Sequence, residues 1–278
     1  MTALSLRDTH SLPVRNVWRW PFTLSRSVDL VEARISDGIG LHHFGLASGY
    51  HPYVRAVAEA ARPSCDDPER AIREALAMYF NRVQPQSPAD WLDMPGAPSE
   101  LVNAPPHAST LPWQKNSPAR WQEVREKGVQ NENRLAGDEL PLSDGWHACG
   151  PVSDRKLDVE TCRLLKLLES IQRKGLQRHN GRDGDIDAVL LRSGRGERWW
   201  INSGHHRSAV LSALGYKTAP VRIKAVIDTT EAKSWPQVQS GLFTEAQAVR
   251  IVERLVDGDL PRVASEWVRY VDSARRRA

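Results

Sequence analysis

The first 93 residues alternate short apolar stretches with polar turns, which is typical of a small mixed α/β region. Residues 22–35 space their apolar side chains as an extended segment does. Three helices are predicted after it, over residues 53–62, 68–83 and 88–92. Asp67 and Ser87 each precede a proline, and a capping side chain followed by proline is a common helix start.

Residues 94–145 interrupt this regular pattern. Seven prolines fall between Pro95 and Pro141, and no apolar periodicity persists. This predicts a long irregular connection, with a short helix near residues 121–126. Trp113 and Trp121 favour a segment that packs against a folded body over one that extends freely into solvent.

The pattern is sharpest between residues 146 and 232. Asp158 is predicted to cap a helix whose apolar stripe begins at Val159 and which Gly175 ends. Two strands, a helix closed by Gly215 and a third strand follow, over residues 186–192, 199–201, 205–214 and 220–227. A capping box from Thr244 to Gln247 opens the first of two C-terminal helices.

These elements predict an α+β fold in which a compact α/β unit is flanked by a mixed N-terminal region and by C-terminal helices. The expected divisions are residues 1–93, 94–145, 146–232 and 233–278.

Composition narrows the class of protein. No run of about eighteen apolar residues exists, so a membrane span is not expected. The three cysteines form no CxxC pair, and residues 1–21 lack the apolar core of a signal peptide. We therefore expect a cytoplasmic protein. The net charge of +4 lies partly in Arg275–Arg277 and is weak evidence for a polyanion partner.

The segment from Ser203 to Ser208 carries the clearest candidate chemistry. Gly204 lets the backbone approach a ligand closely, and the amides of His206, Arg207 and Ser208 fall in the first turn of a helix. A phosphate would satisfy these amides and pair with Arg207. The alternative is an ordinary helix start in which Arg207 binds a carboxylate such as Glu160.

Other candidates have structural alternatives of similar weight. Glu160 and Arg163 lie one turn apart and form either a solvated ion pair or a proton acceptor beside a phosphate-binding arginine. Asp183 and Asp185 are turn residues or, more weakly, magnesium ligands. A further weak candidate is a histidine group near a possible interdomain face, made of His42, His43 and His51.

Two segments resemble the ParB/sulfiredoxin-like superfamily, a nuclease and NTPase fold. Residues 160–175 end in its Ser-Ile-x-x-x-Gly pattern, and residues 203–221 carry the loop Gly-His-His-Arg. In that superfamily the loop cradles nucleotide phosphates. Partition-type members have Gly-Glu-Arg-Arg, and sulfiredoxins have Gly-Cys-His-Arg with a catalytic cysteine. His205 stands at the cysteine position here, so the resemblance does not imply sulfiredoxin activity.

The Gly-His-His-Arg loop is more similar to that of the free serine kinases of the same fold. Those enzymes phosphorylate a small hydroxyl compound with a nucleotide and an acidic base. The resemblance implies Glu160 and His205 as catalytic residues, with ATP or another nucleoside triphosphate and Mg²⁺ as cofactors. The first half of the chain also resembles ParB-like proteins of bacterial surface-polysaccharide gene clusters, through His51-Pro52-Tyr53, Tyr79-Phe80 and Leu111-Pro112-Trp113.

Three classes of function are therefore open. We favour a nucleotide-dependent phosphotransferase or NTPase that acts on a small hydroxyl compound, with a role in surface-polysaccharide metabolism as one setting. A nucleotide-gated DNA-binding protein is the second, although no basic recognition helix is evident for duplex DNA. A binding module without catalysis is the third. The oligomeric state is not predicted.

Overall fold

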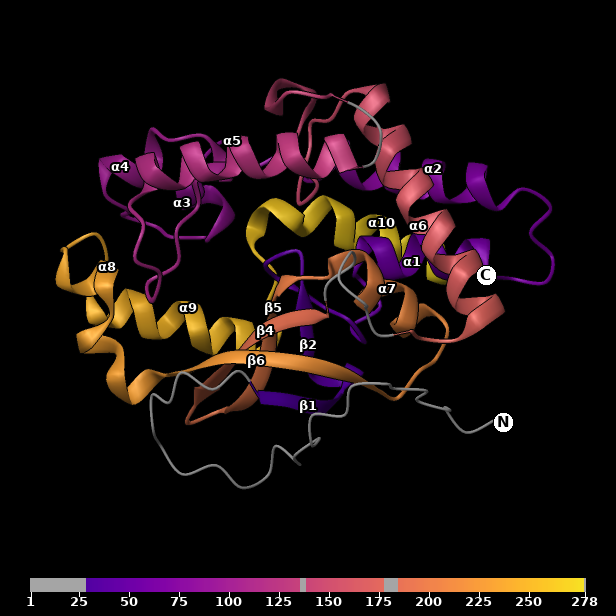
Figure 1. The fold of residues 1–278 in the computed structure, drawn as a ribbon. Helices are drawn as coiled ribbons and strands as arrows, with labels where there is room; N and C mark the ends of the chain where they lie inside the picture. Colours follow the sequence, from indigo (N-terminus) through magenta and orange to yellow (C-terminus); the bar gives the residue numbers. More distant parts are fainter. Residues whose placement is uncertain (1–28, 136–138, 178–184, 278) are drawn as a thin grey trace.

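The computed structural model describes residues 29–135, 139–177 and 185–277 (Figure 1). The fold is mixed α/β, as expected, with helices on both faces of a six-stranded sheet. In that part of the chain, no helix combines the length and apolar character needed to cross a bilayer. Residues 22–28 of the expected extended segment lie outside the described residues, as does Asp183.

The sheet combines strands from distant parts of the sequence in the order β1-β6-β4-β5-β2-β3. The β6–β4 and β5–β2 pairs are parallel and the other three are antiparallel. Strands from residues 29–45 thus share one sheet with strands from residues 186–228, across the division expected near residue 93. The strands are β1 (Asp29–Arg34), β2 (Gly38–Gly40), β3 (Phe44–Gly45), β4 (Ile186–Ser193), β5 (Gly196–Ser203) and β6 (Thr218–Asp228).

The period of two along β4 divides the core into two layers. Ala188 and Leu190 pack into the cluster that includes helices α1 (Pro52–Ala60), α6 (Asp154–Lys174) and α7 (His205–Ala213). Val189 and Leu191 face the opposite side, where α9 (Glu245–Asp257) covers the sheet. The site described below lies in the first layer.

Most of the predicted helix starts are confirmed. Asp67 caps α2 (Pro68–Phe80), and Ser87 caps α3 (Pro88–Trp91). At α9 both hydrogen bonds of the Thr244–Gln247 capping box are present. The remaining helices are α4 (Ser99–Val102), α8 (Pro236–Gln239), α10 (Ser265–Arg275) and the short 3-10 helices η1 (Ile35–Asp37), η2 (Pro106–Ala108), η3 (Leu142–Asp144), η4 (Thr229–Ser234) and η5 (Arg262–Ala264).

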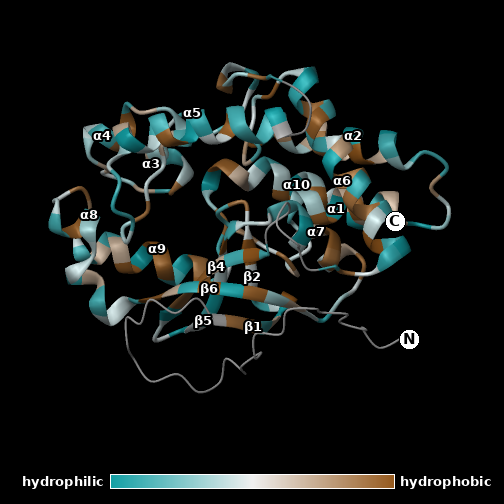
Figure 2. Ribbon diagram, viewed as in Figure 1, coloured by the Kyte–Doolittle hydropathy of each residue, from teal (hydrophilic) through white to brown (hydrophobic). Residues whose placement is uncertain are grey.

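The prediction of irregular structure was wrong for α5 (Pro118–Leu135), where only a short helix was expected. Ser117 and Pro118 form a start signal, and the Arg120 amide lies 3.4 Å from the Ser117 hydroxyl. Figure 2 shows α5 mostly in hydrophilic and neutral colours, because Arg, Gln, Glu and Lys dominate it. Such residues favour helix without producing an apolar stripe, so hydrophobic periodicity does not reveal this helix.

The predicted start of α6 was also wrong. Ser153 is the cap, since its hydroxyl accepts the Lys156 amide hydrogen at 3.1 Å, and the helix begins at Asp154. Asp158 lies within the helix, where it pairs with Arg73 of α2 at 2.7 Å. The earlier start adds one helical turn that includes Lys156, four residues before Glu160, and the two side chains form an ion pair at 2.8 Å.

Candidate functional site

The loop between β5 and α7 has the geometry expected of a close approach. Gly204 has a φ of 90°, in the left-handed region that favours glycine. A Cβ at this position would lie 3.1 Å from the Ile186 Cα, so space as well as conformation favours glycine. Because glycine has no side chain, α7 begins without a side-chain cap.

The first turn of α7 can therefore offer amides to an external acceptor. The Ser208 amide makes the first bond of the helix, to the Gly204 carbonyl at 3.0 Å, and the amides before it have no acceptor within α7. Beside them Arg207 and Asp185 help to line a cavity of about 10 Å³. That space is about the size of one water molecule, so a phosphate would dock at the surface of this turn.

Glu160 of α6 is the centre of a buried network. Its side chain is 0% exposed, and its Oε1 lies 2.8 Å from the Lys156 Nζ and 3.1 Å from the nearest Arg163 nitrogen. Its Oε2 lies 2.5 Å from the His206 Nε2 and accepts the Tyr53 hydroxyl at 3.1 Å. One carboxylate thus joins α1, α6 and the start of α7. We call these residues and Asn133 the Glu160 network.

The network also ties α5 to the site. The Lys156 side chain is fully buried, and its Nζ donates to Asn133 Oδ1 at 2.9 Å. Asn133 in turn donates to the Leu140 carbonyl at 2.9 Å. Arg163 donates a further bond to the backbone carbonyl of Glu132. Each of these buried charges has a charged or hydrogen-bonded partner, which is what burial of a charge requires.

Electrostatics keep Glu160 ionised. Burial by itself raises the pKa of the Glu160 carboxyl, but His206, Lys156 and Arg163 outweigh it and hold this pKa well below its ordinary value. A carboxylate with so low a pKa is a weak proton acceptor. Two permanent cations against one carboxylate also leave the Glu160 network with net positive charge.

His206 is better placed than Glu160 to exchange a proton. Its Nε2 donates to the Glu160 carboxylate at 2.5 Å, so Nδ1 is the ring nitrogen that Glu160 does not engage. The side chain is 19% exposed, whereas Glu160 is fully buried. A partly exposed imidazole oriented by a buried carboxylate is the arrangement of a general base.

His205 has a different environment. Its Nδ1 accepts the Leu41 amide hydrogen at 3.2 Å, and burial lowers the pKa of its imidazole to about 3. The ring is therefore neutral, with its proton on Nε2, and acts as a hydrogen-bond donor rather than as a base. Its ring centre lies 5.6 Å from that of His147.

The other predicted residues divide between the loop and the core. Ser203 is exposed at the end of β5, while the Ser208 hydroxyl is turned inward and donates to the His205 carbonyl at 3.0 Å. Arg163 belongs to the Glu160 network. Asp185 lies 2.6 Å from Arg222. In the ranges that the structure describes, no three His, Cys, Asp or Glu side chains form a group able to hold a metal ion.

In the alternative, Arg207 binds a carboxylate such as Glu160, but the charged partners of Glu160 in the structure are His206, Lys156 and Arg163. Three members of the network, Lys156, Tyr53 and Asn133, were absent from the candidates. Lys156 and Glu160 have the i, i+4 spacing of an ion pair, a signal that the sequence offers. Tyr53 carries no such signal, since its contact with Glu160 joins residues 107 positions apart.

The weak histidine candidates are all buried. His51 accepts the Val54 amide hydrogen at Nδ1 at 3.3 Å and so caps α1, a structural role. His42 and His43 lie on the turn between β2 and β3. The His42 ring contacts Trp146 and Trp200 rather than members of the Glu160 network.

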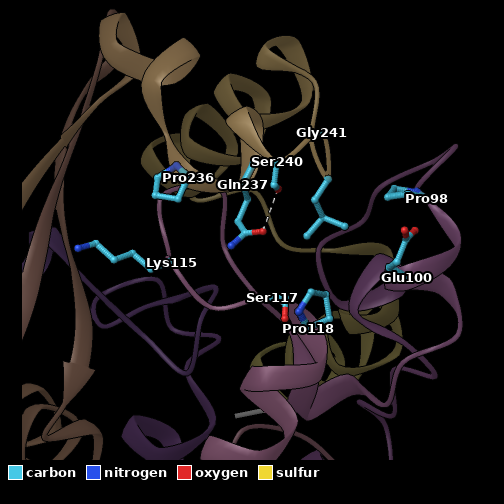
Figure 3. Close-up of a pocket in the computed structure, with 10 residues that line it drawn as sticks. Pro98, Glu100, Lys115, Ser117, Pro118, Pro236, Gln237, Ser240 and Gly241 are labelled. Carbon is cyan, nitrogen blue, oxygen red and sulfur yellow. Dashed lines mark hydrogen bonds between the residues drawn. The ribbon is translucent and has the colours of Figure 1, made fainter.

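A larger cavity lies elsewhere, between the start of α5 and α8 (Figure 3). Its volume is about 330 Å³, and none of the predicted site residues lines it. The buried Gln237 at its wall already donates to the Gln114 and Asn116 carbonyls, at 2.7 and 3.0 Å. The side-chain amide of Gln237 is therefore hydrogen-bonded within the protein.

Comparison with known proteins adds no assignment: no protein-family model, no curated protein and no solved structure matches this chain.

Proposed function

We propose that this protein binds a nucleoside triphosphate at the start of α7 and transfers its terminal phosphoryl group to a small hydroxyl compound or to water. The observation that carries the proposal is the uncapped first turn of α7, with Arg207 in that turn and the Glu160–His206 pair directly beside it. Amides that have no acceptor within the helix suit phosphate oxygens, and a guanidinium pairs with them in a bidentate manner.

The chemistry assigned to the residues follows from their protonation states. His206 Nδ1 accepts the proton of the attacking hydroxyl, whose oxygen then bonds to the terminal phosphorus. The bond from that phosphorus to the bridging oxygen breaks, and the nucleoside diphosphate leaves with the electron pair. Glu160 stabilises the imidazolium that forms, and is in this account a positioning residue rather than the base.

Mg²⁺ commonly neutralises the phosphates in such reactions. Asp185 would have to exchange Arg222 for the metal, because the two side chains are already 2.6 Å apart. A metal held mainly by the phosphates needs at most one or two carboxylates from the protein. Because Asp185 already pairs with Arg222, we assign no described residue as a magnesium ligand.

DNA binding has less support among the described residues. The apolar stripe of α9 packs against the sheet, and Trp267 and Val271 of α10 are buried against the first layer. A recognition helix needs an outward face that enters the major groove. Both α9 and α10 pack against the core of the fold, and neither stands apart from it as a recognition helix would.

Calorimetric titration with ATP, GTP and CTP, with and without Mg²⁺, tests the binding. We expect Arg207→Ala to weaken binding by about 1.5–3 kcal/mol, the usual worth of a charge-assisted hydrogen bond. Arg70→Ala is the matched control, because Arg70 is an exposed arginine paired with Glu74 on α2. Equal affinities in the two variants would contradict a phosphate site at α7.

Turnover tests the chemistry separately. His206→Asn should lower nucleotide consumption by about 10²–10⁴-fold, the usual contribution of a general base, while nucleotide affinity stays near that of the parent. Serine and simple sugars are the first hydroxyl substrates to assay. A parent protein that binds nucleotide but consumes none with any substrate is a binding module.

A further inference from the structure

A second group of polar side chains lies under α5, next to the Glu160 network. The guanidinium carbon of Arg125 lies 5.0 Å from the ring centre of Trp121 and 5.2 Å from that of Trp146. The ring centres of His42 and His147 lie 5.1 and 5.6 Å from that of Trp146. We call these five residues the Arg125 cluster.

Each member of this cluster has a buried nitrogen without a hydrogen-bond partner among the residues that the structure describes. The atoms are Arg125 Nε, Trp121 Nε1, Trp146 Nε1, His42 Nδ1 and His147 Nδ1. Buried polar atoms are nearly always paired, because an unpaired one loses its hydrogen bonds to water without replacing them. Five such nitrogens, on side chains that contact Arg125 or Trp146, indicate that a hydrogen-bond partner is missing from the cluster.

The chemistry of these atoms specifies what is missing. An indole nitrogen and a guanidinium Nε can only donate, and a neutral imidazole can present a donor at either nitrogen by changing its tautomer. The missing partner must therefore be a hydrogen-bond acceptor. The Glu132 carboxylate lies 3.7 Å from the His147 Nδ1 and attracts Arg125 without forming an ion pair with it, so an acceptor that pairs directly with Arg125 and balances its charge would be an added anion.

The backbone beneath the cluster is strained. Leu41 and His42 have φ values of 45° and 70°, in the left-handed region, and neither is a glycine. A residue with a side chain is disfavoured in this backbone conformation, and conformations of this kind gather at functional sites. The His42 carbonyl accepts the Trp200 indole at 2.9 Å, which holds the turn with the His42 ring against Trp146.

We propose that the Arg125 cluster binds the carboxylate or phosphate group of a small anionic ligand, with Arg125 and Trp146 as its main donors. Trp121 and Arg125 are half-buried, so the cluster reaches the surface along α5, which crosses the top of the molecule in Figure 1. The proposal is independent of nucleotide binding at α7, which uses different residues.

Equilibrium binding of inorganic phosphate, sulfate and malonate to the full chain tests this proposal, with potassium chloride at equal ionic strength as the reference. Thermal unfolding and intrinsic tryptophan fluorescence both report on binding, because Trp121 and Trp146 contact Arg125. Arg125→Met keeps the length of the side chain and removes its charge and donors. Arg120→Met is the matched control, since Arg120 is an exposed arginine on the same helix, paired with Glu123.

We expect the parent and Arg120→Met to respond to one of the anions and Arg125→Met to bind it about tenfold or more weakly, because a charge-assisted bond is lost. The preferred anion distinguishes a phosphate from a carboxylate ligand. Because phosphate also binds at α7 under the proposed function, the tryptophan fluorescence response is the readout for the cluster, and Arg207→Ala should keep that response. If it is lost in Arg207→Ala and kept in Arg125→Met, the anion binds at α7 and the proposal is wrong.

A response to chloride equal to that of the other anions, or no response in the parent, would likewise overturn the proposal and assign the unpaired atoms to water. Trp146→Phe keeps the test decisive if Arg125→Met does not fold. This variant removes one indole donor and should weaken anion binding several-fold, with circular dichroism confirming that the chain is folded.

Discussion

The Glu160 network and the Arg125 cluster meet at His147, and they differ in how their buried atoms are paired. In the network, the Glu160 carboxylate accepts bonds from four side chains, and Lys156 and Asn133 are bonded in turn. In the cluster, each of five side chains keeps a buried nitrogen without a partner in the described structure.

The two groups illustrate two roles that buried polar side chains can have in a fold. A saturated network holds its members in fixed positions, and it ties α1, α5, α6 and α7 together here. An unsaturated cluster lowers the stability of the chain on its own, so a fold retains it where a ligand completes it. The sequence does not distinguish the two, since both are made of histidines, arginines and aromatic residues.

Acid pH should produce the largest effect. Burial lowers the pKa of His43, His51 and His205 to about 3, and it holds the pKa values of His42 and His147 well below the ordinary value. In the unfolded chain these rings titrate near pH 6.5. Below that pH the unfolded state binds more protons, so stability falls as the pH decreases towards 3.

Each such histidine contributes about 1.4 kcal/mol per pH unit in this window, so the free energy of unfolding should drop by several kcal/mol between pH 7 and pH 5. Glu160 adds to this loss only below about pH 4.5, where its carboxyl protonates in the unfolded chain but stays ionised in the folded one. Urea unfolding at a series of pH values measures the slope. His43→Phe should flatten it by one histidine, and a flat profile in the parent would mean that these rings are charged when folded.

Loss of the central carboxylate is the next largest effect. Glu160→Gln keeps the size of the side chain but leaves Lys156 and Arg163 without a counter-ion in the core, which should cost about 3–5 kcal/mol in the free energy of unfolding. Glu74→Gln breaks an exposed pair with Arg70 on α2 and should cost about 0.5 kcal/mol or less. Similar losses in the two variants would show that the Glu160 network does not stabilise the fold.

The sequence predicts those elements whose signals are local. The capping residues Thr244 and Gln247 predict the start of α9, and Gly204 and Gly215 mark the two ends of α7. The sequence predicts only a short part of α5, near residues 121–126, because a polar helix that covers a polar cluster has no apolar stripe. The three-residue β2 and two-residue β3 are too short to show a period of two.

The same limit applies to the site. Gly204, His206 and Glu160 could be found from the loop pattern and from their helix, and they lie together. The contact of Tyr53 with Glu160 depends on how α1 packs against α6, which no spacing in the chain records. The contact of Arg125 with Trp146 depends in the same way on how α5 packs, and the sequence predicts only a short part of that helix.

A smaller effect is expected at Tyr53. Its hydroxyl lies 2.9 Å from the His147 carbonyl and 3.1 Å from Glu160, so Tyr53→Phe should cost about 0.5–1.5 kcal/mol. Tyr79→Phe is the matched control, since that buried hydroxyl donates to the Ala148 carbonyl at 2.5 Å, outside the network. Urea unfolding should give similar losses for both. A much larger loss at Tyr53 would mean that its bond to Glu160, rather than the one to the carbonyl, dominates.

The smallest change should come from Arg125→Met in the ligand-free protein. Its contacts with two indole rings are worth about 0.5–2 kcal/mol, and removal of a desolvated charge that has no ion-pair partner offsets that loss. The free energy of unfolding should therefore change by about 1 kcal/mol or less. A loss of about 3 kcal/mol or more would place Arg125 in a saturated network like that of Glu160. With the anion added, the parent should gain stability that the variant does not, because only a ligand that binds the folded state raises its stability.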